Sequence, residues 1–268
     1  MVLEFLVAAV GINGIFFGFA AVLRTDKVTD LSYSLTFLVL AVWGILRLPA
    51  EPTLWQLVLA GMVVLWALRL GGYLLVRILA TGVDHRFDRM RDKPLVFARF
   101  WILQAVTVWV VMLPYALGLS AARAVSPWVW LGCGIWLAGL WLESVSDAVR
   151  YRFRRQAENA SRPVDAGPWR YSRHPNYFGE MLVWWGIWLA LLPAWVDRAG
   201  LVLVSALGPV FITGLLLFVS GIPLLEKSSA SRYGAAWEAY AARTSLLVPW
   251  FPRRDVPTPP IASKRRRR

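Results

Sequence analysis

Residues 199–225 read AGLVLVSALGPVFITGLLLFVSGIPLL, a run without an ionisable side chain. A helix of about 20 mainly apolar residues is long enough to cross the hydrocarbon core of a bilayer. Similar runs recur along the chain, and we expect seven membrane-spanning helices, at residues 2–23, 30–48, 54–78, 98–119, 126–148, 176–194 and 199–225. The sequence therefore predicts an all-α integral membrane protein, a bundle of about seven transmembrane helices.

The composition of the whole chain agrees with this class. Its 268 residues are 58% hydrophobic and 17% charged, whereas soluble domains are about 45–50% apolar and about 25% charged. The 16 Trp residues are expected mostly at the two membrane interfaces, where this side chain is enriched. Cys133 is the only cysteine, and His85 and His174 are the only histidines, so we predict neither an intramolecular disulfide nor a metal site.

The distribution of Lys and Arg predicts how the bundle is oriented. Of these 29 residues, 25 lie in alternate connections and in the C-terminal segment, three lie in the other connections, and Arg69 lies within a span. By the positive-inside rule the N-terminus is outside and the C-terminus is cytoplasmic. An odd number of spans fits this assignment. We expect one transmembrane domain over residues 1–252, in a bacterial inner membrane.

The C-terminal end of the chain is basic. Residues 264–268 are all Lys or Arg, and they follow the breaker-rich stretch PTPP at 257–260. We interpret residues 253–268 as a basic disordered tail that touches anionic headgroups. Although the net charge is +13, no soluble unit is left to bind nucleic acid, and membrane lipids are the partners that we expect.

Ionisable side chains within the predicted spans are functional candidates, because each costs about 2.5–3.5 kcal/mol on insertion scales. All of them fall in the predicted cytoplasmic half of their helix, which suggests a polar cavity open to the cytosol. They are Asp30, Arg69, Glu143, Asp147, Glu180 and Glu226. Some could instead be interfacial residues that reach the headgroups. Arg69 lies deeper and requires a partner, for which Asp30 or Glu143 is available.

Residues 167–180 read GPWRYSRHPNYFGE and form the most informative motif. Proline favours the first position of a helix, so we expect a helix to begin at Pro175. Asn176 and Glu180, four residues apart, then share one face. Arg173 and His174 directly precede the helix, and both arginine and helix N-termini bind phosphate. The motif predicts a site for a nucleotide phosphate or pyrophosphate, although an ordinary loop-to-helix junction explains it equally well.

Residues 172–180, SRHPNYFGE, resemble the signature of the membrane reductases that include the steroid 5α-reductases and the C14 and C7 sterol reductases. Asp147 and Arg154 match the acidic residue and the arginine that precede this signature. The segment 226–249 resembles the closing segment of the same family. The best fit is the bacterial branch of the 5α-reductase group, long described only as a domain of unknown function. The similarity covers roughly residues 60–252.

This resemblance implies a seven-span bundle that binds NADPH from the cytosol. It also implies an oxidoreductase acting on CH–CH groups, which transfers a hydride to the C=C bond of an enone lipid such as a 3-oxo-Δ4 steroid. The substrate would enter sideways from the bilayer. Carried over to this sequence, the cofactor-binding positions are Asp147, Arg154, Asn176 and Glu180, with Arg173, His174, Tyr177, Tyr233, Arg69 and Arg86 as plausible additions.

The sequence departs from the animal steroid 5α-reductases in the second span. Those enzymes have a Gln-Glu pair there for the ketone of the substrate, and this chain has none. Asp30 and Tyr33 are the polar residues available in that helix. We expect one of them to be the catalytic acid that polarises the ketone oxygen.

A second family shares part of the motif. Isoprenylcysteine carboxyl methyltransferases and their bacterial relatives also carry Arg-His-Pro-x-Tyr-x-Gly, which residues 173–179 fit. They bind S-adenosylmethionine, which is cationic at sulfur and has no phosphate. Asn176, Glu180 and the pair Asp147 and Arg154 suit a phosphorylated dinucleotide better. The resemblance therefore favours the reductase, with the methyltransferase as the alternative.

Overall fold

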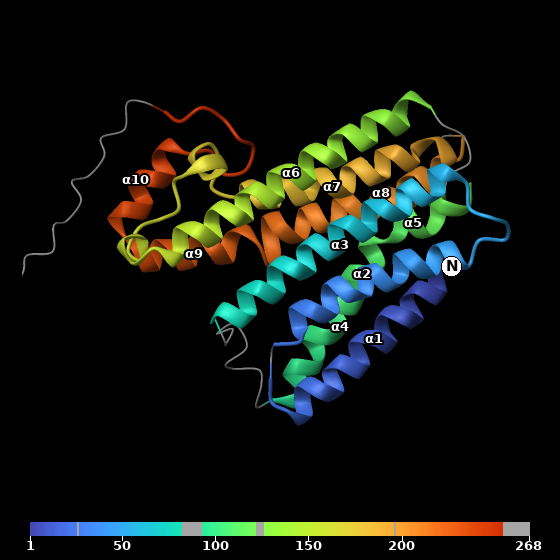
Figure 1. Cartoon of the computed structure of the whole chain (residues 1–268), viewed down its shortest axis with the longest axis horizontal. Coiled ribbons are helices and arrows are strands. Elements are labelled where there is room, and N and C mark those ends of the chain that lie inside the picture. Colours follow the sequence, from blue (N-terminus) through green and yellow to red (C-terminus); the bar gives the residue numbers. More distant parts are fainter. Residues whose placement is uncertain (26, 82–92, 122–125, 196, 254–268) are drawn as a thin grey trace, which may run out of the picture. The chain divides into compact units, whose positions relative to one another are not determined.

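The computed structural model describes residues 1–25, 27–81, 93–121, 126–195 and 197–253. Ten α-helices are found within these ranges (Figure 1). Their bounds are α1 Val2–Val22, α2 Thr29–Leu46, α3 Leu54–Thr81, α4 Pro94–Val111, α5 Leu113–Gly118, α6 Pro127–Arg155, α7 Pro175–Leu191, α8 Ala199–Gly214, α9 Ile222–Tyr233 and α10 Ala235–Arg243. Arg86, a predicted cofactor-binding residue, lies outside the described residues, as does almost all of the predicted basic tail.

The predicted membrane class is confirmed. Within the described ranges, six helical stretches are long and apolar enough to cross a bilayer, and the bent pair α4–α5 makes a seventh if it counts as one span. The predicted spans begin within a few residues of the observed helices. Some helical stretches are longer than predicted, most of all at α6, which continues to Arg155, and at α9, which extends the last predicted span to Tyr233. The orientation of the termini stays a prediction.

The fourth span is broken, whereas the sequence predicts one continuous helix over residues 98–119. α4 and α5 meet at Met112 with a bend of 43°. Pro114 lies in the first turn of α5, where its ring crowds the carbonyl oxygen one turn earlier and favours a bend. α8 passes closely here, since a Cβ atom on Gly208 would lie 2.7 Å from Pro114 Cδ and 2.9 Å from the Val111 carbonyl oxygen. The bend therefore lies where two helices are in backbone contact.

The last apolar run is also irregular. α8 ends at Gly214, a π-helical turn follows over Leu215–Val219, and α9 begins at Ile222 after Gly221. A side chain at Gly221 would meet the Leu216 carbonyl oxygen at 2.4 Å, so glycine is required. α9 and α10 are joined by Gly234, whose φ of +51° lies in the region that glycine tolerates best.

Contacts divide the described chain into two compact units. Unit 1 comprises residues 1–140 and 181–213, and unit 2 comprises residues 141–180 and 214–268. α6 and α7 each contribute to both units. The prediction of one domain over residues 1–252 stays a prediction, and each unit is described by itself.

Unit 1 is a helical bundle in which α1, α2 and α4 lie side by side, with α3 against α2 (Figure 1). Its core contains three mutually packed rings, Phe37, Trp66 and Trp184, whose centroids are 5.0–5.1 Å apart. Across the described residues of both units, eight of the 16 Trp residues of the chain are buried. The expectation that the Trp residues lie mostly at the two membrane interfaces stays a prediction.

A buried polar cluster joins three of the helices of unit 1. Gln104 of α4 donates through Nε2 to Asn13 Oδ1 of α1 and to Ser32 Oγ of α2, both at 2.8 Å. Asn13 in turn donates to Thr36 Oγ1 at 3.2 Å. Hydrogen bonds between apolar helices favour one packing register, because a displaced helix would leave these groups unpaired.

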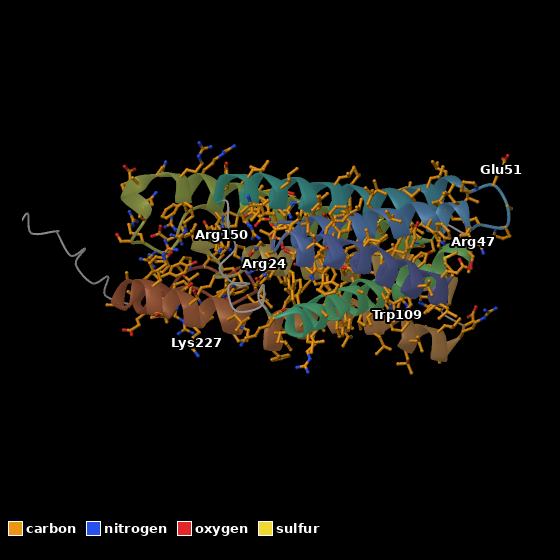
Figure 2. The ribbon with its side chains drawn as sticks, turned by 90° about the horizontal axis from the view of Figure 1, so that it is seen from below. Arg24, Arg47, Glu51, Trp109, Arg150 and Lys227 are labelled. Carbon is orange, nitrogen blue, oxygen red and sulfur yellow. The ribbon has the colours of Figure 1, made fainter. Side chains whose placement is uncertain are left out.

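Ion pairs mark both ends of α2. Arg47 contacts Glu4 of α1 through Nη2 at 2.9 Å, at the end of unit 1 where Trp109 also lies, and Arg24 lies at the opposite end of α1 (Figure 2). Near the start of α2, Asp30 pairs with Arg77 of α3 at 2.5 Å. The sequence predicts Asp30 or Glu143 as the partner of Arg69, and that pairing stays a prediction. Arg69 lies over the Tyr73 ring, 5.8 Å from its centroid.

Candidate cofactor site

The motif 167–180 forms the centre of unit 2. A short 3-10 turn, Gly167–Arg170, leads into α7, which begins at Pro175 as the sequence predicted. Gly167 has φ of +55°, and its position against Val149 of α6 leaves only 3.1 Å for an added Cβ atom. The turn is therefore held close to α6, and the residues between it and α7 are brought to the last turns of that helix.

Arg173 and His174 are held by one carboxylate. Glu226 of α9 accepts from Arg173 Nη1 at 2.9 Å and contacts His174 Nε2 at 2.7 Å. Because an ionised carboxylate only accepts, Nε2 carries the proton, and in the neutral imidazole Nδ1 is then an acceptor. The ring also stacks on Tyr177, at 5.7 Å between centroids with an angle of 7°. The imidazole is fixed on two sides.

The other side of this imidazole is unsatisfied. His174 is only 2% exposed, and its Nδ1 atom is buried with no hydrogen-bond partner among the described residues, as is Nε of Arg173. Burial lowers the pKa of His174, and the Glu226 carboxylate opposes that shift only in part. A buried acceptor without a partner is costly, so this atom is suited to receive a donor from a bound molecule.

Two arginines of α6 complete a basic cavity. A cavity of about 40 Å³ is lined by Arg150, Arg154, Arg173 and His174, together with Trp169 and residues of α9 and α10. Arg154 donates to the Arg162 carbonyl oxygen at 2.9 Å and lies over the Tyr233 ring, 5.1 Å from its centroid. Three guanidinium groups around one space provide the donor set that phosphate oxygens require.

Asp147 and Asn176 also meet. The Asn176 amide donates to Asp147 Oδ1 at 3.4 Å, which links α6 to the first turn of α7. Oδ1 of Asn176 is buried, and no group in the described part of the chain donates a hydrogen bond to it. Glu180 lies one turn further along α7, on the same face as Asn176.

Hydrogen bonds of Trp169 and Tyr240 hold the motif in place. Trp169 donates through Nε1 to the Ser146 carbonyl oxygen at 2.8 Å. The Tyr240 hydroxyl of α10 donates to the Trp169 carbonyl oxygen at 2.6 Å and lies 3.3 Å from that of Ser172. Burial raises the pKa of Tyr240 well above its usual value, so this phenol stays a hydrogen-bond donor.

The structure brings most of the predicted cofactor-binding residues together in unit 2. Contacts join Asp147 to Asn176, Arg154 to Tyr233, and His174 to Tyr177, and Arg173 and His174 share Glu226. Asp30, Tyr33 and Arg69 belong to unit 1. Arg86 lies outside the described residues. The roles of all these residues stay predictions.

Sequence reasoning missed several residues of this arrangement. Glu226 was named among the ionisable candidates of the predicted spans, and no role in holding the motif was assigned to it. Trp169 lies within the quoted motif and was given no role. Arg150 follows Asp147 by three residues and precedes Arg154 by four, so its helical spacing was the signal that could have included it.

Fold and site together define a multi-pass helical membrane protein with an arginine-lined polar site, which is built from the end of α6, the segment that leads into α7, and the helices α9 and α10. The chain belongs to the family described as "Protein of unknown function (DUF1295)", which matches residues 16–244. It is also similar to 3-oxo-5-alpha-steroid 4-dehydrogenase 1 of Macaca fascicularis, with 27% identity over 121 residues. That match covers 45% of this chain and 40% of the length of the relative. No solved structure matches the chain.

Proposed function

We propose that the protein is a membrane-embedded, NADPH-dependent reductase that transfers a hydride to the C=C bond of an enone lipid. The observation that carries the proposal is the cavity of unit 2, where three arginines surround a buried histidine with an unsatisfied acceptor atom. The similarity to a steroid 4-dehydrogenase supports the same reaction class. A 3-oxo-Δ4 steroid is the substrate that this similarity favours.

The residues of the site fit a phosphorylated dinucleotide. Arg150, Arg154 and Arg173 would hold phosphate oxygens, since guanidinium groups bind them with paired hydrogen bonds. Nδ1 of His174 would accept from a hydroxyl group, such as that of a ribose. Asn176, with a buried carbonyl oxygen that has no partner, would accept from an amide or hydroxyl group.

The alternative is an S-adenosylmethionine-dependent methyltransferase of the isoprenylcysteine carboxyl methyltransferase type. Its cofactor carries a positive charge at sulfur, which an arginine-rich cavity would repel. Its one carboxylate could be held by a single arginine, whereas three line this space. The charge of the cavity therefore favours NADPH.

When bound, NADPH would supply the hydride that reduces the β-carbon of the enone. The protein would then have to stabilise the negative charge that develops on the ketone oxygen. We assign this to the hydroxyl of Tyr33, whose ring packs edge-on against Phe37 at 5.1 Å. Asp30, the other candidate acid, is engaged in an ion pair with Arg77. A proton from water would complete the reduction at the α-carbon.

Cofactor binding tests the proposal first. Detergent-purified protein would be titrated with NADPH, NADH and S-adenosylmethionine by calorimetry at low salt. We expect saturable binding of NADPH, weakened about 10- to 100-fold in Arg154→Ala, since a hydrogen bond to a charged group is worth about 1.5–3 kcal/mol. Arg152→Ala, which removes an exposed arginine of the same helical turn, is the matched control and should bind normally.

Turnover of enone lipids is the second test. Asn176→Ala and Glu180→Ala should each abolish NADPH-dependent reduction of a 3-oxo-Δ4 steroid, with expression at the usual level. Normal turnover in both variants would refute the site assignment. Binding of S-adenosylmethionine without NADPH binding would instead establish the methyltransferase.

A further inference from the structure

The segment that follows α10 exposes an unusual number of apolar side chains. We name residues 244–253 the C-terminal strap. Within six consecutive residues of it, Leu246 is 40%, Val248 52%, Trp250 71% and Phe251 79% exposed. A soluble surface seldom presents such a run, and contiguous apolar exposure marks a surface that contacts another apolar phase.

The strap is nevertheless firmly held. Its backbone bonds to the motif at three points, which are Arg173 N to Ser245 O at 2.8 Å, Trp250 N to Tyr171 O at 3.0 Å, and Ser172 Oγ to Leu247 O at 2.7 Å. Arg253 N also bonds to Arg243 O at 3.0 Å, which closes the strap onto α10. The exposed side chains are therefore presented by a fixed backbone.

Arginines surround the exposed rings. A cavity of about 590 Å³ beside the strap is lined by Arg170, Arg243 and Arg253 together with Phe251, and a second cavity of about 390 Å³ shares Arg243, Phe251 and Arg253. Asp165 is the acidic residue in this lining, and it pairs with Arg243 at 3.3 Å. The lining of the larger cavity thus keeps a positive charge, at Arg170 and Arg253.

We propose that the C-terminal strap is a membrane-surface anchor, with the phosphate of an anionic phospholipid bound between Arg170 and Arg253. Trp250 and Phe251 would insert among the headgroups, the level at which aromatic side chains favour the bilayer. The strap would thus offer exposed apolar side chains to the bilayer and a basic cavity to the lipid phosphate. Each arginine near an anionic surface contributes about 1 kcal/mol, which is about fivefold in affinity.

The location of the strap tests the proposal in the intact protein. A Cys133→Ser background would receive a single cysteine by Trp250→Cys, labelled with an environment-sensitive fluorophore, in nanodiscs of phosphatidylcholine with or without phosphatidylglycerol. We expect quenching by brominated acyl chains and protection from aqueous iodide. Glu238→Cys, an exposed position of α10 outside the strap, is the control and should be quenched by iodide. Iodide quenching of both labels in both lipids would overturn the proposal.

The lipid charge provides the second readout. Arg170→Gln combined with Arg253→Gln should lower the preference of the strap label for phosphatidylglycerol over phosphatidylcholine by about 25-fold. Arg152→Gln combined with Arg155→Gln removes the same charge from the exposed end of α6 and should leave the preference unchanged. If both double variants lost the preference for phosphatidylglycerol equally, the effect would come from the overall positive charge, and the proposed phosphate site would be wrong.

Soluble phosphates could occupy the same cavity. NADPH and inorganic phosphate would therefore be added at matched ionic strength to discs that contain phosphatidylglycerol. We expect no change in the strap label, because a lipid phosphate held at the surface is not displaced by them. Reversal of the phosphatidylglycerol effect by either molecule would assign the cavity to a soluble ligand and overturn the proposal.

Discussion

Glu226 Oε1 lies 2.7 Å from His174 Nε2, and the other oxygen of the same carboxylate accepts from Arg173 at 2.9 Å. A single residue of α9 thus fixes two adjacent residues of the motif that are about fifty positions away in the sequence. It also sets the imidazole tautomer, so that Nδ1, the buried ring nitrogen, is an acceptor. We regard Glu226 as a positioning residue of the candidate site.

Glu226→Gln should weaken NADPH binding and stability together. The amide oxygen still accepts a hydrogen bond, but the negative charge of the carboxylate that contacts Arg173 and His174 is lost. This loss costs about 1.5–3 kcal/mol. Titration of NADPH, with thermal unfolding beside it, measures the two effects. Glu238→Gln, an exposed glutamate of α10, should change neither. A variant with unchanged NADPH affinity would contradict the positioning role.

Mild acid should destabilise the protein through His174. Its pKa lies below the ordinary value of 6.5, chiefly because the ring is buried. Between the two values the unfolded chain binds a proton that the folded chain does not, so stability falls as the pH drops below about 6.5. Unfolding temperatures at about pH 7.5 and about pH 5.5 measure the difference. In His174→Gln this loss should be smaller, and an equal loss would mean that other groups cause it.

Much of the fold could be predicted from the sequence, because each span is a local property of length and apolarity. The start of α7 at Pro175 is likewise a local signal. The bend at Met112 was not predicted, since a proline within an apolar run can lie in a straight or a broken span, and here its packing against Gly208 accompanies the break. Irregularity within a span depends on neighbours that the sequence does not name.

The candidate site, like the fold, could be predicted only in its local features. The motif predicted which residues are polar and which turn of α7 they share, because those relationships are local. The partners of the motif come from distant segments, as with Glu226 for His174 and Tyr240 for Trp169. Arg77 likewise pairs with Asp30 from another helix. Charge and spacing indicate that a partner is needed, but only the packing of the helices identifies it.

The buried cluster around Gln104 should contribute to the stability of unit 1. Gln104→Leu removes donors to Asn13 and Ser32 and should destabilise the protein by about 0.6–2 kcal/mol, the range for hydrogen bonds between membrane helices. Unfolding in sodium dodecyl sulfate would measure it. Leu103→Ala, at an exposed position of the same helix, is the control. Stability equal to that of the control variant would show that the cluster contributes only specificity.

The hydroxyl of Tyr240 should matter more for the cofactor site than for the bundle. Tyr240→Phe removes the hydrogen bond to the Trp169 carbonyl oxygen and leaves that group without its donor, at a cost of about 1–3 kcal/mol. Because Trp169 precedes Arg173 and His174 in the motif, we expect NADPH affinity to fall as well. Calorimetric titration of the variant checks this, and unchanged affinity would show that the motif holds its shape without this bond.

A close helix crossing provides the sharpest test of the packing in unit 1. Gly132 of α6 and Gly186 of α7 meet so closely that a Cβ atom on Gly186 would lie 2.8 Å from the Gly132 carbonyl oxygen and 2.7 Å from the backbone nitrogen of Trp136. Small residues at such crossings let membrane helices approach. The obstacles are backbone atoms, so they cannot turn aside as a flexible side chain could.

Gly186→Ala should therefore separate α6 from α7 and destabilise the protein by about 1–3 kcal/mol, the usual cost of overpacking. Gly134→Ala adds the same methyl group to α6 at a position with no atom within 4 Å, and it should be neutral or slightly stabilising, because alanine favours helix over glycine by about 1 kcal/mol. Unfolding in sodium dodecyl sulfate compares the two variants directly. If Gly186→Ala were as stable as Gly134→Ala, the two helices would not cross as closely as these backbone distances require.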